Sequence, residues 1–252
     1  MSLAGRTIVI TGAGRGLGRA FAEACAAAGA ANIVVADIQK EWGEATAEKL
    51  RHSGAKAMFA AVDLGDPKSI SAFAAKVETE CGPIDGLVNN GAIATGIGGK
   101  TFEEIDIETW DRVMAVNVRG TWLMTRAMAP LLRRSKAGGR IVNVASDTAL
   151  WGAPRLLHYV GSKGAVISMT RSLARELGPD NIAVNAIAPG LVLVEATEYV
   201  PAERKELYIT GRAMQRAQHP DDVTGVVVFL LGQGAGFVTG QLLPVNGGFV
   251  FN

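Results

Sequence analysis

A phenol and an ammonium lie four residues apart in the segment His158-Tyr159-Val160-Gly161-Ser162-Lys163. If this segment is helical, Tyr159 and Lys163 share one face of the helix. A tyrosine phenol has a pKa of about 10, and a fixed ammonium nearby favours the phenolate and lowers that pKa. The pair then becomes a candidate proton acceptor near neutral pH. The same spacing also occurs on ordinary solvated helix faces, so the rest of the chain must decide.

A glycine-rich stretch, Thr11-Gly12-Ala13-Gly14-Arg15-Gly16-Leu17-Gly18, follows the β-branched run Thr7–Ile10 and precedes a small-residue helix expected over 16–29. Glycines let the backbone turn sharply and approach a pyrophosphate, whose charge meets the free N–H groups at the helix start. Alone, the stretch fits a tight strand-to-helix turn equally well.

Asp37 ends the second predicted strand, 19 residues after Gly18 (37 − 18). About 20 residues separate the loop from the carboxylate that binds the adenosine ribose in dinucleotide sites. Such a carboxylate accepts hydrogen bonds from the ribose hydroxyls and repels a 2′-phosphate, which favours NAD over NADP. Arg15 argues weakly for NADP, because a cation in this loop can meet a 2′-phosphate. Asp37 carries more weight because it would occupy the contact itself.

The elements that would position these groups alternate along the chain. Strands apolar on both faces, separated by helices, indicate a parallel sheet covered on both sides. We find no linker or repeat and predict one doubly wound α/β domain of about seven strands over residues 1–252. The least regular segment, 191–218, is predicted to be a substrate loop or lid. Strands are expected near 7–10, 32–37, 57–63, 87–88, 140–144, 183–187 and 241–245, and helices near 16–29, 40–53, 67–81, 108–134, 157–177 and 221–231.

Composition narrows the function classes. The chain has 25 Lys+Arg against 24 Asp+Glu, a net charge of +1, which gives no reason to expect nucleic acid or an anionic membrane as partner. Cys25 and Cys81 lack metal-ligand spacing, the three histidines are scattered, and no apolar run approaches the ~20 residues of a membrane span. We therefore expect no metal site, and a cytoplasmic location.

From Arg6 to Gly248 the chain resembles the classical short-chain dehydrogenase/reductase family. The matching motifs occur in the family's order: Thr-Gly-x-x-x-Gly-x-Gly at 11–18, Asp63-Leu64 after the third strand, an altered Asn89-Asn90-Gly91-Ala92, Asn117, Ser146, Tyr159-x-x-x-Lys163 and Pro189-Gly190. Several spaced motifs in this order are far more specific than any one of them. The resemblance implies a Rossmann-type fold and a nicotinamide-dependent oxidoreductase.

The resemblance also implies a catalytic set of Asn117, Ser146, Tyr159 and Lys163. Tyr159, as phenolate, takes the proton of a substrate hydroxyl while hydride passes to NAD, and the reverse step reduces a ketone. Lys163 lowers the pKa of the phenol and binds the nicotinamide ribose, Ser146 holds the substrate oxygen, and Asn117 supports a water that links Lys163 to solvent. Taken singly, Ser146 could equally cap a turn, and Asn117 could bridge backbone groups in a helix kink.

Cofactor contacts follow from the same motifs, with two departures. Val194 stands where the family usually has a threonine that contacts the nicotinamide carboxamide, so Val192 is expected to supply a backbone contact. Asn246 replaces the usual aspartate of Val-Asp-Gly-Gly. The expected cofactor-binding residues are Gly12, Arg15, Gly16, Leu17, Gly18, Asp37, Ile38, Asp63, Leu64, Asn90, Tyr159, Lys163, Pro189, Gly190 and Val192.

The substrate pocket is expected between the Ser146–Tyr159 region and the 191–218 segment. Trp151 and the leucines suggest an apolar or aromatic body for the substrate, although such residues often only pack behind a pocket. No cluster of Arg or Lys marks an acidic carrier, although Arg155 and Arg212 lie in plausible places. The expected substrate-binding residues are Ser146, Thr148, Trp151, Tyr159 and Leu191, with Asp147, Pro154, His158 and Leu193 as further candidates.

Three functions remain open. The leading one is an NAD-dependent oxidoreductase that interconverts a secondary alcohol and a ketone on a small, cyclic or aromatic substrate. The alternatives are an NADPH-dependent 3-oxoacyl thioester reductase and, from another class, a non-catalytic NAD-sensing protein. Apolar stripes on the helices at 108–134 and 157–177, which similar proteins pair between subunits, predict a homotetramer, with the tail 249–252 at another interface.

Overall fold

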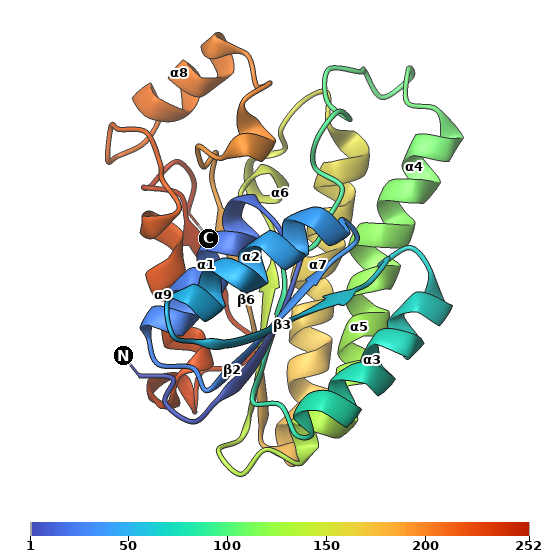
Figure 1. Cartoon of the computed structure of the whole chain (residues 1–252). Coiled ribbons are helices and arrows are strands. Elements are labelled where there is room, and N and C mark those ends of the chain that lie inside the picture. Colours follow the sequence, from blue (N-terminus) through green and yellow to red (C-terminus); the bar gives the residue numbers. More distant parts are fainter. Residues whose placement is uncertain (1, 252) are drawn as a thin grey trace.

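The computed structural model describes residues 2–251, which form a seven-stranded sheet in which every paired neighbour is parallel (Figure 1). The strand order is β3-β2-β1-β4-β5-β6-β7, so the chain winds outward from β1 to β3 and then returns beside β1 at β4. This confirms the predicted doubly wound α/β fold. The strands are β1 Thr7–Thr11, β2 Asn32–Asp37, β3 Lys56–Ala61, β4 Gly86–Asn89, β5 Gly139–Val144, β6 Ile182–Pro189 and β7 Leu242–Val245.

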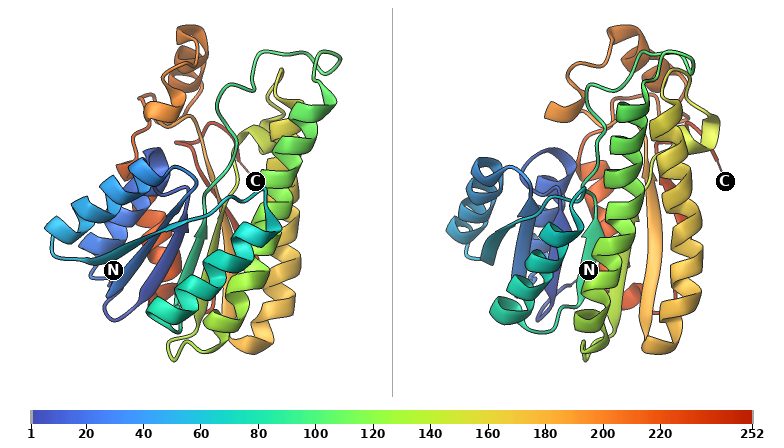
Figure 2. Two further views of the ribbon diagram at one scale, coloured as in Figure 1. Left: turned by 45° about the vertical axis from the view of Figure 1, so that its right-hand side comes forward. Right: turned by 90° about the vertical axis from the view of Figure 1, so that its right-hand side faces the viewer.

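Helices cover both faces of the sheet (Figures 1 and 2). The N-terminal helices and the last long helix pack on one face, and the three central helices pack on the other. The first group is α1 Gly16–Ala27, α2 Lys40–His52 and α9 Asp221–Leu231; the second is α3 Pro67–Cys81, α5 Thr121–Arg133 and α7 Leu157–Leu177, with α4 Ile107–Met114 leading into α5. The short elements are η1 Ala115–Gly120, α6 Thr148–Trp151, η2 Gly178–Asp180, η3 Glu195–Thr197, α8 Ala202–Thr210 and η4 Gln233–Ala235.

Both faces of the central strands are buried, which explains why these strands are apolar at nearly every position. Along β1, Ile8 and Ile10 join the core under α1, α2 and α9, whereas Val9 joins the core under α3 and α5. Successive side chains of a strand point to opposite faces. A parallel sheet covered on both sides therefore needs continuous apolar runs.

The helical stretch expected over 108–134 is interrupted where α4 meets α5. Ala115–Gly120 forms a π-helical turn, and Asn117 on it is 1 % exposed. Gly120 fits there because an added Cβ would lie 2.6 Å from the Leu64 carbonyl oxygen. Such π turns are frequent at functional sites. Hydrophobic periodicity does not distinguish this turn from a continuous helix.

Residues 191–218 connect β6 to α9 and contain η3 and α8. We refer to this segment as the lid. In Figures 1 and 2 it rises beyond the end of the sheet at which the loop before α4 also lies. Within residues 2–251, no helix is long and apolar enough to cross a membrane.

Candidate active site

A cavity of about 890 Å³ follows the carboxyl edge of the sheet. Its walls come from the residues that end or follow strands β1 to β6 and from the lid. It lies at the point where the strand order reverses between β1 and β4, which is where open α/β sheets bind their ligands. Every predicted cofactor-binding residue contributes to its lining.

The glycine loop forms the floor of one half of the cavity. Gly12 and Gly16 have φ of +62° and +56°, a conformation that favours glycine. A Cβ on Gly18 would lie 2.0 Å from the Gly12 carbonyl oxygen, so only glycine lets α1 approach β1 this closely. The side chain of Arg15, which precedes α1, does not cap the helix. The Gly16 N–H is bonded to the Glu195 carboxylate of the lid, and the N–H groups that follow it are available to an anion such as a pyrophosphate.

Asn90 and Thr11 fix this loop from below. The Asn90 Nδ2 donates to the carbonyl oxygens of Thr11 and Gly12 at 2.9 and 3.1 Å. The Thr11 Oγ1 accepts from the backbone N–H groups of Asn90 and Gly91 at 3.0 and 2.9 Å. Gly91 packs closely against the loop, because a Cβ there would lie 2.7 Å from the Leu64 Cδ1 and 3.2 Å from the Gly12 backbone nitrogen. Asn90 thus acts on the shape of the loop.

Asp37 is held at the cavity wall by two backbone groups. Its Oδ2 accepts from the Gly14 N–H at 2.8 Å and its Oδ1 from the Gln39 N–H at 2.9 Å. A carboxylate has about four acceptor sites, so capacity remains for ribose hydroxyls. Arg15 stacks on Trp42, with the guanidinium carbon 4.3 Å from the ring centroid. The cradle and this carboxylate fit a dinucleotide whose ribose lies at Asp37.

Tyr159 and Lys163 share a face of α7 as predicted, with the Lys163 Nζ 5.7 Å from the centre of the phenol ring. The Lys163 Nζ donates to the Val144 carbonyl oxygen at 2.7 Å, and burial lowers the Lys163 pKa to about 8. Burial raises the pKa of the Tyr159 phenol to about 12, and a hydrogen bond with Ser146 offsets part of that rise. The phenol pKa is therefore raised in this structure and not lowered as predicted, because the loss of hydration on burial dominates.

Ser146 and Asn117 both form the structural contacts that the sequence analysis gave as alternatives to a catalytic role, a turn cap for Ser146 and a backbone bridge for Asn117. The Ser146 Oγ accepts from the Thr148 N–H at 3.3 Å and the Thr148 Oγ1 at 2.9 Å, so it caps α6 while bonding Tyr159. The Asn117 Oδ1 accepts from the Ile93 N–H at 2.7 Å, and its Nδ2 donates to the Ile93 carbonyl oxygen and the Ser162 Oγ, both at 3.1 Å. Asn117 therefore bridges the loop after β4 to α7, and its part in a water relay stays a prediction.

Thr148 and Leu191 line the substrate half of the cavity, as expected, whereas Trp151 does not. The Trp151 Nε1 donates to the Tyr208 hydroxyl at 3.3 Å, and its ring packs edge-on against Tyr208 and Phe249. The predicted direct contact of Trp151 is wrong because Tyr208 stands in front of it. His158 is also fully buried outside the lining, and Pro154 and Leu193 are absent from it.

The lid contributes residues that the sequence did not single out: Tyr199, Val200, Arg204 and Tyr208. Their segment was predicted to cover the pocket, but irregular backbone gives no period from which inward-facing positions can be read. The Tyr199 hydroxyl donates to the Ala94 carbonyl oxygen at 2.8 Å, which ties the lid to the loop after β4. On the other side, the Arg19 Nη2 of α1 contacts the Glu195 Oε1 at 2.5 Å. The lid therefore spans the cavity and is attached on both sides.

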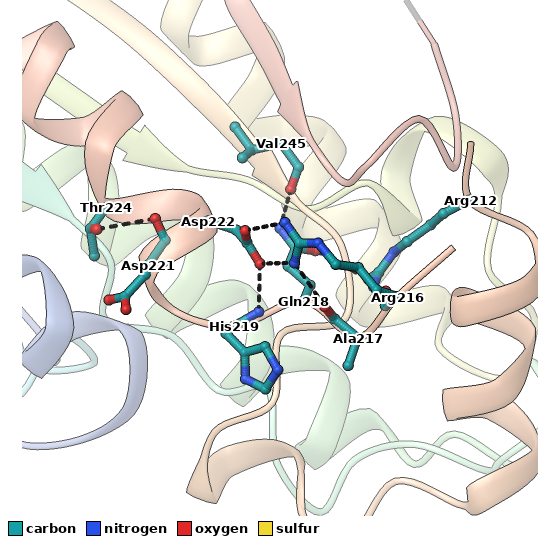
Figure 3. A network of polar contacts seen from close by, with 9 residues as sticks. All are labelled: Arg212, Arg216, Ala217, Gln218, His219, Asp221, Asp222, Thr224 and Val245. Carbon is teal, nitrogen blue, oxygen red and sulfur yellow. Dashed lines mark hydrogen bonds and ion pairs between the residues drawn. The ribbon is translucent and has the colours of Figure 1, made fainter. Parts of the chain in front are cut away.

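A second group of contacts anchors the far end of the lid (Figure 3). The Arg212 Nη2 donates to the Leu191 carbonyl oxygen at 2.9 Å and to the Gln218 Oε1 at 3.1 Å. The Gln218 Nε2 donates to the Val245 carbonyl oxygen at 2.6 Å, and Arg216 pairs with Asp222 through two bonds of 2.6 and 2.7 Å. The Gly190 N–H also donates to the Val245 carbonyl oxygen at 3.2 Å, so the Pro189-Gly190 turn is bonded to β7 beside these contacts of the lid.

Asp147, next to Ser146, is fully buried. Its Oδ1 accepts from the Tyr208 hydroxyl at 3.0 Å. Burial raises the Asp147 pKa to about 7, although the Tyr208 hydrogen bond and the charge of Arg212 oppose the rise. The ionised carboxylate in turn raises the pKa of Tyr159. A titrating group is thus built into the wall behind the candidate reacting phenol.

No cluster of three or more His, Cys, Asp or Glu that could hold a metal ion occurs in the described chain. Both cysteines are free, and burial raises the Cys25 pKa to about 12. The side chains with acid–base or nucleophilic groups that meet around Tyr159 are thus Ser146, Asp147, Tyr159 and Lys163.

Comparisons with known proteins agree with this geometry. A family model described as enoyl-(acyl carrier protein) reductase matches residues 12–250. The 3-oxoacyl-[acyl-carrier-protein] reductase of Aquifex aeolicus is 33 % identical and the sorbitol dehydrogenase of Cereibacter sphaeroides 37 % identical, each alignment covering 98 % of both chains. The crystal structure of a gluconate 5-dehydrogenase from Burkholderia cenocepacia, in complex with NADP and tartrate, superposes with a TM-score of 0.91 at 30 % identity, covering 98 % of this chain and 96 % of the other.

Proposed function

The chain belongs to the short-chain dehydrogenase/reductase family of nicotinamide-dependent oxidoreductases acting on CH–OH groups, and we propose that it interconverts a secondary alcohol and a ketone with NAD. The observation that carries the cofactor choice is the Asp37 carboxylate, fixed at the cavity wall by Gly14 and Gln39. A ribose 2′-phosphate at this point would meet a negative charge at hydrogen-bonding distance. The bound nicotinamide would supply the hydride acceptor.

The proton chemistry is assigned to Tyr159, with Ser146 as the second group on the carbinol oxygen. In oxidation the Tyr159 oxygen takes the hydroxyl proton, and in reduction the phenol returns it to the carbonyl oxygen. Because burial raises the phenol pKa to about 12, Tyr159 is protonated at neutral pH and is prepared for reduction. Oxidation needs the phenolate, so its rate should rise with pH. Below about pH 8 Lys163 is an ammonium, and its positive charge, 5.7 Å from the phenol ring, favours the phenolate.

The proposed substrate is small, with a cyclic or aromatic body. The support is the character of the wall beside Tyr159, where Ile93, Leu156, Val200 and Tyr199 line the cavity. Apolar and aromatic side chains with a few polar groups are typical of small-molecule sites.

An NADPH-dependent 3-oxoacyl thioester reductase remains the second candidate. Arg15, stacked on Trp42 at the cavity wall, is the observation that favours it, together with the similarity to the reductase of Aquifex aeolicus. A non-catalytic NAD sensor is the weakest candidate, because a sensor has no need for Tyr159, Lys163 and Ser146 together.

The test is a panel of secondary alcohols and ketones assayed with NAD(H) and NADP(H). We expect kcat/KM with NAD to exceed that with NADP by about 10-fold or more, since one misplaced charge is worth more than about 1.4 kcal/mol. Tyr159→Phe should lose about 10³-fold or more in kcat while binding NADH as the wild type does. Retained turnover in Tyr159→Phe would place the acid elsewhere, and a preference for NADP would overturn the Asp37 argument.

A further inference from the structure

Arg204 is a cation in the cavity wall whose side chain has no hydrogen-bond or ion-pair partner in residues 2–251. It lies in the first turn of α8 and lines the cavity. Its guanidinium carbon is 5.8 Å from the centre of the Trp151 ring, which lies behind Tyr208. Arginine carries five N–H donors in a planar fork. The donors of Arg204 are thus available to a ligand, and an indole ring limits the directions that the side chain adopts.

The other hydrogen-bond donors that the lid and α6 place around this half of the cavity are already engaged. The Tyr199 hydroxyl donates to the Ala94 carbonyl oxygen, and the Tyr208 hydroxyl donates to Asp147. The Thr148 hydroxyl donates to Ser146, which with Tyr159 is assigned to the carbinol oxygen. Arg204 therefore remains as the polar group for a second substituent of the substrate.

The surroundings of Arg204 favour an anion as that substituent. The walls between Tyr159 and the lid are largely apolar, with Leu156 and Val200 among them. Asp147 also lines the cavity and its carboxylate interacts with the Arg204 charge, but it accepts from the Tyr208 hydroxyl and is not within ion-pair distance of the guanidinium. Charge-assisted and bidentate bonds to a carboxylate are the strongest that an arginine makes, and they gain strength where water is excluded.

We propose that Arg204 binds a carboxylate of the substrate, so that the enzyme acts on hydroxy acids and the corresponding keto acids. An apolar body separates the anionic group from the carbinol, which lies at Ser146 and Tyr159. This inference rests on the proposed function for the position of the carbinol. Neither cation that the sequence suggested takes this role, since Arg155 lies outside the lining and Arg212 is committed to Leu191 and Gln218.

Two matched sets of probes test the proposal on the full-length protein. For turnover the probes are 3- and 4-hydroxycyclohexanecarboxylate and their methyl esters, assayed with NAD. For binding without chemistry, cyclohexanecarboxylate and its methyl ester are titrated calorimetrically into protein saturated with NADH. The variants are Arg204→Gln, which removes the charge, and Arg204→Lys, which keeps it without the fork. Lys205→Gln is the control, because Lys205 is the neighbouring cation of α8 and does not line the cavity.

We expect the wild type to bind the acid at least about 10-fold more tightly than the ester, and Arg204→Gln to lose about 10- to 100-fold of the affinity for the acid alone. Arg204→Lys should fall between them, and Lys205→Gln should match the wild type. Equal binding of acid and ester, or equal affinities in wild type and Arg204→Gln, overturns the carboxylate site. Absence of Tyr159-dependent turnover with every alcohol overturns the proposed function, and carboxylate binding that depends on Arg204 would survive that result.

Discussion

Asp147 links the protonation state of a buried carboxyl group to the acidity of Tyr159. The ionised Asp147 carboxylate raises the pKa of the Tyr159 phenol, so Asp147→Asn should lower that pKa. The rate of alcohol oxidation should then begin to rise at a lower pH than in the wild type. At pH 8 we expect oxidation to be roughly a few-fold faster in the variant. Below about pH 7 the wild-type carboxyl is itself neutral, so the two profiles should converge there. The measurement is log kcat/KM between pH 6 and 10.

Tyr208→Phe is the control for that experiment, because the Tyr208 hydroxyl is hydrogen-bonded to Asp147. The groups facing Asp147 are the Tyr208 hydroxyl, the Asn246 side chain and the charges of Arg204 and Arg212. Those facing Tyr159 are Ser146, Asp147, Tyr199 and Lys163. Tyr208→Phe removes the hydrogen bond that stabilises the carboxylate, so it should raise the Asp147 pKa and move the point of convergence to higher pH. Superimposable profiles for the wild type and Asp147→Asn would remove Asp147 from the proton chemistry.

Lys163 should reduce the stability of the fold at neutral pH. Its side chain is 4 % exposed, and burial lowers its pKa from 10.5 to about 8. Between these values the unfolded chain holds the proton that the folded chain has released, so stability rises with pH across that window and the penalty is complete below pH 8. We expect Lys163→Met to be inactive and about 1–3 kcal/mol more stable than the wild type at pH 7.

Denaturant unfolding at pH 7 and pH 10.5 tests this expectation. The difference between Lys163→Met and the wild type should shrink at the higher pH, where the lysine is neutral in the folded chain and about half deprotonated in the unfolded chain, so that most of the penalty is lost. A difference that stays constant across the window would show that packing, and not charge burial, is responsible.

At the scale of elements, the lid is held to helix α1 through Glu195, which forms an exposed ion pair with Arg19 and accepts from the Gly16 N–H. The Arg19 and Glu195 side chains are 38 % and 41 % exposed, so the pair contributes no more than about 1 kcal/mol. Lid opening limits turnover in many enzymes. We expect Glu195→Gln to leave the melting temperature unchanged and to speed NADH release about 2- to 5-fold.

Stopped-flow displacement of NADH measures that rate. High salt should bring the wild type close to Glu195→Gln, because exposed charges are screened. Glu198→Gln is the matched control, since Glu198 lies on the same segment and forms no ion pair within residues 2–251. Equal release rates for the wild type and Glu195→Gln would show that other contacts, such as that of Tyr199, hold the lid.

The sequence predicted the helix boundaries well where residues close in the chain determine them. Helices α3, α7 and α9 begin and end at the predicted residues because caps, prolines and glycines define their ends. It could not predict the π turn at Asn117 or the inward side of the lid, because both depend on contacts with distant residues such as Leu64 and Asp147. For the same reason the sequence placed Trp151 in the cavity lining, although it packs behind Tyr208. It also predicted a lowered pKa for the Tyr159 phenol, which burial raises.

At the scale of the whole molecule, the expected assembly is a homotetramer. Trp122 at the start of α5 is 45 % exposed and Ile107 at the start of α4 is 76 % exposed, consistent with apolar residues left uncovered on those helices. Sedimentation velocity should give a particle of four times the 26.3-kDa chain mass. Trp122→Lys should shift it to smaller species, since a charge at the centre of an interface is costly. A 26.3-kDa particle for the wild type would contradict this expectation. Of the tail 249–252, Asn252 lies outside the described residues.

The position of β7 sets an order in which the site can be completed during synthesis. β7 pairs with β6, its Val245 carbonyl oxygen accepts from the Gly190 N–H and the Gln218 Nε2, and it leaves the ribosome after every other strand. The glycine loop follows β1, Asp37 ends β2, and Asn90, which bonds the glycine loop, follows β4. These residues are therefore synthesised well before β7, which bonds the Pro189-Gly190 turn. The half of the cavity at the Pro189-Gly190 turn is therefore complete only after the last strand has been made.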